Sequence, residues 1–203
     1  LTPRIASALP DVVSAGLFLW VWIDPSAWRH DLVAQLMLVM LLEFILVHSA
    51  PFLGGAVMAH DQPRWTRIRV VLGLGAIYLL FVGAWAWMFQ SLWAVGAFVW
   101  LLGSKMVAIM LNRQSDQDTK HEQSALWGLS VMFYLVAVIG TVVIPLPELG
   151  VTLHGHAYGI PGSGAWVSDP HIVLAAGVVY FSLLAMSKLG RWSRGMAKHA
   201  RVN

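Results

Sequence analysis

The chain has 203 residues, of which 58% are hydrophobic and only 11% are charged. Because a soluble globular protein carries about 25% charged residues, this chain cannot cover a water-exposed surface, and its exterior is expected to face lipid. The absence of cysteine excludes disulfides, Fe–S clusters and thiolate zinc sites. The net charge of +3 comes from basic residues beside apolar segments, which is typical of membrane topology and not of nucleic-acid binding.

Six apolar segments approach the length of about 20 residues that a membrane-spanning helix requires. In chain order they are residues 7–23, 32–52, 70–89, 92–111, 124–145 and 172–189. Gln90 and Ser91 interrupt the apolar run 70–111, and this predicts a tight turn between two spans, with one long bent helix as the alternative. Since hydrocarbon offers no hydrogen-bond partner, each span must be a helix. The sequence therefore predicts an all-α polytopic membrane helix bundle that forms a single integral-membrane domain over residues 1–203.

The basic residues predict the orientation of this bundle. With a cytoplasmic N-terminus, all Lys and Arg residues except Arg29 and Lys105 fall on the cytoplasmic side, as the positive-inside rule requires. This predicts six transmembrane helices with both termini cytoplasmic, in a bacterial-type inner membrane and without a cleavable signal peptide. The basic tail 190–203 is explained by the same topology, and could also lie on anionic lipid. Most of the 11 Trp residues fall near predicted span ends, which favours an aromatic belt over an aromatic-lined substrate cavity.

Four ionisable residues lie within or near the predicted spans, where charges are costly and usually functional. They are the candidate residues of an ion or ligand path: Asp11, Glu43, His48 and Lys105. Glu43 and Lys105 lie at similar depths in spans of the same direction, so an ion pair between them is geometrically feasible. Such a pair could fix the helix register or relay protons or ions, or Lys105 could snorkel to the cytoplasmic interface without a partner. Asp11 follows Pro10 and could instead be a helix-start residue.

The stretch HSAPFLGG predicts a bend or an end of the second span. Pro51 removes the hydrogen bond that the Val47 carbonyl would accept, and Gly54 and Gly55 follow. The free carbonyl beside His48 could bind an ion, a water molecule or a ligand. The alternative is a packed helix end in which His48 bonds to a neighbour.

Four histidines fall on the predicted outer side of the membrane: His30, His154, His156 and His171. His154 and His156 form an HGH pair in the glycine-containing outer loop 145–170. Imidazole ligands suit Zn or Cu, although the spacing matches no specific metal motif. The sequence leaves three interpretations open: a Zn or Cu site, a cap or partner-docking loop, and unrelated histidines.

The sequence contains no GxSxG, P-loop or HExxH motif, so no motif names a reaction. Three functions remain open. The first is an accessory or scaffolding subunit of a larger membrane complex, whose partners are the lipid bilayer and other membrane subunits or further copies of the chain. The second is a small transporter or channel that uses the four intramembrane residues. The third is a metal-dependent membrane enzyme with its site at the outer histidines.

Overall fold

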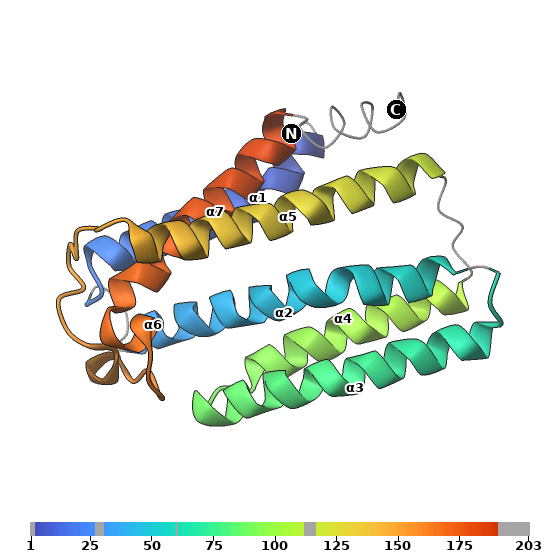
Figure 1. Cartoon of the computed structure of the whole chain (residues 1–203), viewed down its shortest axis with the longest axis horizontal. Helices are drawn as coiled ribbons and strands as arrows, with labels where there is room; N and C mark the ends of the chain where they lie inside the picture. The colour runs from blue at the N-terminus through green and yellow to red at the C-terminus, as the bar shows by residue number, and fades with distance from the viewer. Residues whose placement is uncertain (1–2, 27–30, 60, 112–116, 191–203) are drawn as a thin grey trace. The chain divides into compact units, whose positions relative to one another are not determined.

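The computed structural model describes residues 3–26, 31–59, 61–111 and 117–190 (Figure 1). These residues form only helices, turns and loops, and six of the helices within them are long and apolar enough to cross a membrane. The predicted all-α fold with six spans is therefore confirmed. The helices are α1 (Pro3–Ile23), α2 (Leu32–Met58), α3 (Arg64–Met88), α4 (Trp93–Met110), α5 (Gln117–Val143), the 3-10 helix η1 (Gly155–Tyr158), α6 (Ala165–Ser168) and α7 (Pro170–Gly190). His30 and the tail from residue 191 onward lie outside the described residues.

Several helices extend beyond the apolar segments that predict them. α2 continues through Pro51 to Met58, α3 begins at Arg64, and α5 begins at Gln117. Hydropathy marks only the part of a helix that suits hydrocarbon, whereas backbone hydrogen bonding continues into the polar interface. The second span therefore does not end at Pro51.

A tight turn divides the apolar run 70–111 into α3 and α4. Gln90 adopts a left-handed conformation with a φ of 50°, and its N–H donates to the Trp87 carbonyl at 3.2 Å. The Ser91 N–H donates to the Ala86 carbonyl at 2.9 Å. These two bonds form a Schellman motif, which satisfies the last carbonyls of α3. The predicted division at Gln90 and Ser91 is confirmed.

The chain divides into two compact units. Unit 1 comprises Leu1–Met40 and Gly128–Asn203, and unit 2 comprises Leu41–Trp127. In unit 1, α1 packs against α7, and the Phe18 ring lies directly on Gly177, where a side chain would collide with it. Phe18 also contacts Phe181, with ring centroids 5.5 Å apart. The missing side chain at Gly177 thus brings the first and last helices close together.

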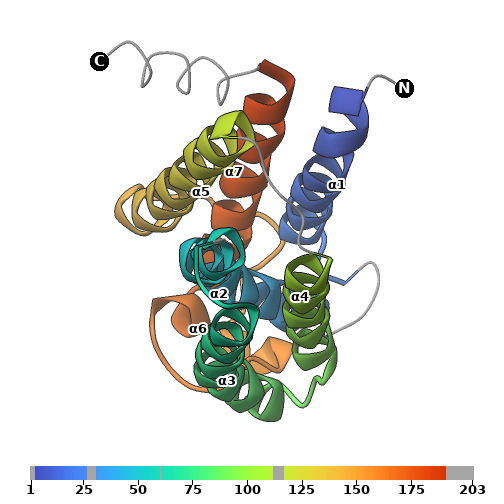
Figure 2. The same ribbon diagram turned by 90° about the vertical axis from the view of Figure 1, so that its right-hand side faces the viewer.

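Unit 2 has its own apolar core. Leu53 of α2, Ile68 and Val71 of α3, and Ile109 of α4 are buried against one another. α3 and α4 lie side by side (Figures 1 and 2). A Cβ atom on Gly75 would lie 2.7 Å from the Leu102 side chain, so glycine is what allows this close approach.

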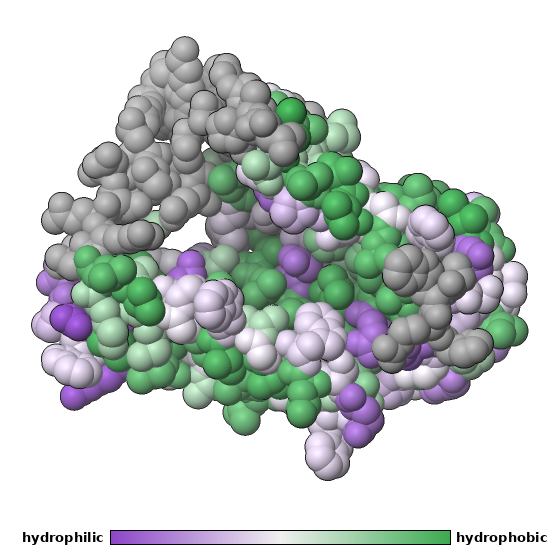
Figure 3. All heavy atoms as spheres, turned by 180° about the vertical axis from the view of Figure 1, so that it is seen from behind, coloured by the Kyte–Doolittle hydropathy of each residue, from purple (hydrophilic) through white to green (hydrophobic). Residues whose placement is uncertain are grey.

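Large apolar side chains also cover much of the exterior. Leu80, Trp87 and Trp100 are 75%, 78% and 80% exposed, and hydrophobic residues dominate much of the face shown in Figure 3. Such surfaces are stable in contact with lipid and are unusually extensive for a protein in water. The chain is therefore a multi-pass membrane protein.

Candidate functional site

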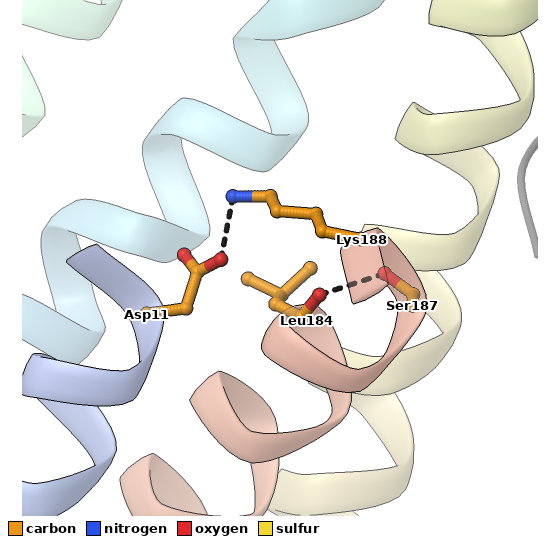
Figure 4. A network of polar contacts seen from close by, with 4 residues as sticks. All are labelled: Asp11, Leu184, Ser187 and Lys188. Carbon is orange, nitrogen blue, oxygen red and sulfur yellow. Dashed lines mark hydrogen bonds and ion pairs between the residues drawn. The ribbon is translucent and has the colours of Figure 1, made fainter. Parts of the chain in front are cut away.

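Asp11 forms an ion pair with Lys188 in unit 1. The Lys188 ammonium lies 2.6 Å from Asp11 Oδ2, and the two side chains come from α1 and α7 (Figure 4). Apart from this ion pair, Oδ2 has no hydrogen-bond partner among the described residues. Nearby, the Ser187 hydroxyl donates to the Leu184 carbonyl of its own helix at 2.8 Å. Asp11 lies inside α1 and not at its start, so its carboxylate links the first helix to the last.

Glu43 and His48 both lie on α2, in the part of that helix that belongs to unit 2. Glu43 is half-buried and takes part in a polar interaction of its own. The His48 ring is exposed and lies against Phe44, with ring centroids 4.5 Å apart. Among the described residues no ion pair joins Glu43 to Lys105. Of the four predicted path residues, Asp11 belongs to unit 1, and Glu43, His48 and Lys105 belong to unit 2.

Trp127 donates a hydrogen bond to the backbone carbonyl that Pro51 leaves without its usual donor. The Trp127 indole Nε1–H donates to the Val47 carbonyl at 2.9 Å. This carbonyl would otherwise accept from the backbone N–H of residue 51, which proline lacks. The free carbonyl predicted from the sequence is thus occupied by a side chain of α5, and the helix continues past the proline without an unsatisfied acceptor.

A cavity of about 410 Å³ lies beside the glycine-rich part of α2. Lys105 of α4 and Ser124 and Trp127 of α5 line it, together with Pro51, Gly54 and Gly55 of α2. A Cβ atom on Gly54 or Gly55 would meet nothing within 4 Å, so the missing side chains leave this space open. Lys105 is half-buried and has neither an ion pair nor a hydrogen bond with any described residue. Lys105, one of the predicted path residues, therefore lines a cavity.

Arg67 caps the C-terminus of α2. The sequence does not reveal this role, because there Arg67 is only one of the basic residues that predict the membrane orientation. Its side chain is 4% exposed. Nε donates to the Ala56 carbonyl at 3.2 Å, and Nη2 donates to the Val57 carbonyl. These carbonyls belong to the last turn of α2 and therefore have no hydrogen-bond donor within the helix itself. A guanidinium at a helix C-terminus also interacts favourably with the helix dipole.

Two of the four histidines predicted on the outer side, His154 and His156, form hydrogen bonds within the loop between α5 and α7. His154 Nδ1 lies 2.7 Å from the Ser168 carbonyl, and His156 Nδ1 lies 3.1 Å from the Ile160 carbonyl. Because a carbonyl only accepts, Nδ1 is the donor in each of these two bonds. Within the described part of the chain, no three His, Asp or Glu residues form a group that could hold a metal ion. The Zn or Cu site stays a prediction that elemental analysis of the purified protein can test.

The outer loop is also fixed to the end of α1. The Trp22 indole donates to the Pro147 carbonyl at 3.1 Å, and the Gly150 N–H donates to the Trp22 carbonyl at 3.1 Å. A side chain on Gly150 would collide with the Ile23 carbonyl. This part of the loop is therefore a packed element of unit 1, and its glycines permit close backbone contact.

Three contacts of these sites had only weak signals in the sequence. Lys188 could have been matched to Asp11 by opposite charge near the same predicted side of the membrane. Trp127 could have been matched to the Val47 carbonyl that Pro51 leaves free, because an indole N–H can only donate a hydrogen bond and needs an acceptor when it is buried. The cap that Arg67 forms on α2 had no signal beyond its place just after that helix. A comparison of the chain with protein-family models, curated proteins and solved structures found no match.

Proposed function

We propose that the protein is a small membrane transporter that binds an organic anion in the cavity beside Lys105. One observation carries the proposal: Lys105 lines a cavity of about 410 Å³ and pairs with no acid among the described residues. A charge within a membrane span is costly, by about 3 kcal/mol at a helix centre. An anion bound beside the ammonium would offset this cost.

The walls of the cavity favour an anion that carries an apolar group. Pro51, Met58 and Trp127 offer apolar surface, whereas Lys105 and the Ser124 hydroxyl are polar groups able to donate hydrogen bonds. A small inorganic anion would leave the apolar walls without contacts. Ligand sites commonly combine an apolar lining with a few polar groups that orient the ligand.

Flux and binding of benzenesulfonate test the proposal. This anion has an apolar ring and remains ionised, so it does not leak across the bilayer as a neutral acid. We expect proteoliposomes containing the full chain to take up labelled benzenesulfonate. Lys105→Gln should reduce both uptake and binding about tenfold or more, since a hydrogen bond to a charged group contributes about 1.5–3 kcal/mol. Lys105→Arg should retain much of both because it keeps the charge.

Two further variants control for charge and for space. Arg69→Gln removes one positive charge from an exposed position outside the cavity and should leave uptake unchanged. Gly54→Leu adds a side chain where a Cβ atom has open space, and should block uptake by filling the cavity. Equal uptake by Lys105→Gln and the unmodified protein would refute the proposal. Binding without any flux would contradict transport.

An accessory or scaffolding subunit is the second candidate, and the exposed face of α4 favours it. A groove of about 650 Å³ runs along this helix past Gly96, Gly103 and Ala108, with Trp100 80% exposed beside it. Small residues let a second transmembrane helix approach closely. Purification in mild detergent should then yield a larger complex that Gly103→Leu disrupts. A solitary monomer under the same conditions would contradict this candidate.

A further inference from the structure

Arg67 retains binding capacity after it has closed α2. The guanidinium has five N–H donors, and the two bonds to Ala56 and Val57 leave three of them. No carboxylate among the described residues pairs with it, although the residue is 4% exposed. The C-terminus of α2 carries a partial negative charge equivalent to roughly one half, which is less than the full positive charge of the guanidinium. A buried guanidinium with unused N–H donors and no acidic partner among the described residues favours an anionic ligand.

The groove beside Arg67 changes from polar to apolar along its length. It has a volume of about 420 Å³ and lies between the end of α2 and the first half of α3. Gln62, Thr66 and Arg67 line it near the start of α3. Val70 and Leu74 continue the same face of α3 at intervals of four residues, and Phe52 of α2 also lines the groove. A ligand that fits must therefore be charged at one end and apolar at the other.

We infer that this groove binds an anionic phospholipid, with its phosphate at Arg67 and an acyl chain along Phe52, Val70 and Leu74. Arginine pairs with phosphate through charge-assisted hydrogen bonds from its planar fork. The polar end of the groove lies near the start of α3, where exposed Arg64 and the 70% exposed Trp65 are typical of a membrane interface. The lipid phosphate would thus meet Arg67 at the depth where headgroups reside.

The composition of the groove distinguishes this lipid from related ligands. A free phosphate would use only the polar end and leave the apolar residues without contacts. A zwitterionic headgroup carries an ammonium group, but none of the groove-lining residues is acidic. Basic pockets at the cytoplasmic side of membrane proteins commonly bind anionic headgroups. The inference is independent of the proposed transport function, because Lys105 does not line this groove.

Native mass spectrometry of the full chain in a neutral detergent tests the inference. The protein is titrated with dioleoylphosphatidylglycerol and, separately, with dioleoylphosphatidylcholine. We expect one phosphatidylglycerol molecule to bind in preference to phosphatidylcholine. Arg67→Gln should weaken this binding about tenfold or more, since it removes a charged hydrogen-bond donor. Arg69→Gln, the matched control, removes the same charge from an exposed position outside the groove and should bind the lipid as the unmodified protein does.

A second pair of variants covers the case in which Arg67→Gln fails to fold. Thr66→Val and Ala59→Leu alter the groove while leaving the bonds from Arg67 to α2 in place, and each should weaken phosphatidylglycerol binding severalfold. Equal lipid retention by these variants and by Arg69→Gln would show that the lipid is only annular and would overturn the inference. Full displacement of the lipid by an equal concentration of glycerol phosphate would identify a soluble phosphate as the ligand, and would also overturn it.

Discussion

Asp11 and Lys188 differ in their access to water, and this difference controls the effect of replacing either residue. The Lys188 side chain is 31% exposed, whereas the Asp11 side chain is 11% exposed. A lysine that loses its partner can extend its ammonium toward the interface, but a buried aspartate cannot. The two residues are therefore not equivalent, although they form one ion pair.

Lys188→Met is expected to destabilise the protein more than Asp11→Asn. The first change leaves an uncompensated carboxylate and should lower the free energy of unfolding by about 2–4 kcal/mol, whereas the second should cost about 1–2 kcal/mol. The double variant should recover part of the loss, because it leaves no unpaired charge. Denaturant unfolding in detergent measures all three. Strictly additive losses would show that the two side chains do not interact.

The Trp127 indole and Pro51 should be coupled in stability. Trp127→Phe removes the donor to the Val47 carbonyl and is expected to cost about 1–3 kcal/mol, since it leaves a backbone acceptor unsatisfied. In a Pro51→Ala background, the new backbone N–H can donate to the same carbonyl. Trp127→Phe should therefore cost clearly less in that background. Thermal unfolding of the four proteins measures the coupling, and an equal cost in both backgrounds would contradict it.

At the scale of elements, the ends of helices were the hardest features to predict. The apolar run 32–52 identifies the second span, but α2 ends at Met58, where Arg67 acts as a C-terminal cap. The cap comes from another helix, so no local pattern in α2 indicates it. By contrast, Gln90 and Ser91 correctly predict the turn between α3 and α4, because polar residues are costly in the middle of a span.

Gln90 is expected to tolerate glycine and to reject β-branched residues. Its φ of 50° is a conformation that glycine adopts freely and that β-branched residues rarely adopt. Gln90→Gly should leave stability unchanged or raise it by up to about 1 kcal/mol, whereas Gln90→Ile should lower it by about 1–3 kcal/mol. Thermal unfolding in detergent provides the comparison. An isoleucine variant as stable as the original protein would contradict the left-handed turn.

At the scale of the whole molecule, the six spans among the described residues place the start of α1 and the end of α7 on the same side of the membrane. The distribution of Lys and Arg predicts that this side is the cytoplasm. A fluorescent reporter that folds only in the cytoplasm, fused after Asn203, should therefore be active. A reporter that is active only outside the cytoplasm should be inactive at the same position. The reverse pattern would refute the predicted orientation.

The four ionisable residues predicted within the membrane have different neighbours in the folded molecule. The sequence groups Asp11, Glu43, His48 and Lys105 by depth in the membrane, since depth follows from the position along each span. The sequence cannot predict which side chains contact these residues, because a uniformly apolar helix gives no indication of which face packs against which other helix. The structure pairs Asp11 with Lys188, leaves Lys105 beside a cavity, and divides the four residues between two units.

The sequence by itself determined the membrane class, the helical fold and the six spans that the described residues contain. These depend on hydrophobicity and on the need of each backbone to satisfy its own hydrogen bonds in lipid. Only the tertiary structure decided which polar groups are satisfied and which are available. Trp127 donates to the Val47 carbonyl and Lys188 pairs with Asp11, whereas Lys105 and Arg67 line cavities and pair with no acidic residue in the described part of the chain. Such pairings depend on contacts between segments far apart in the chain, and local composition does not encode them.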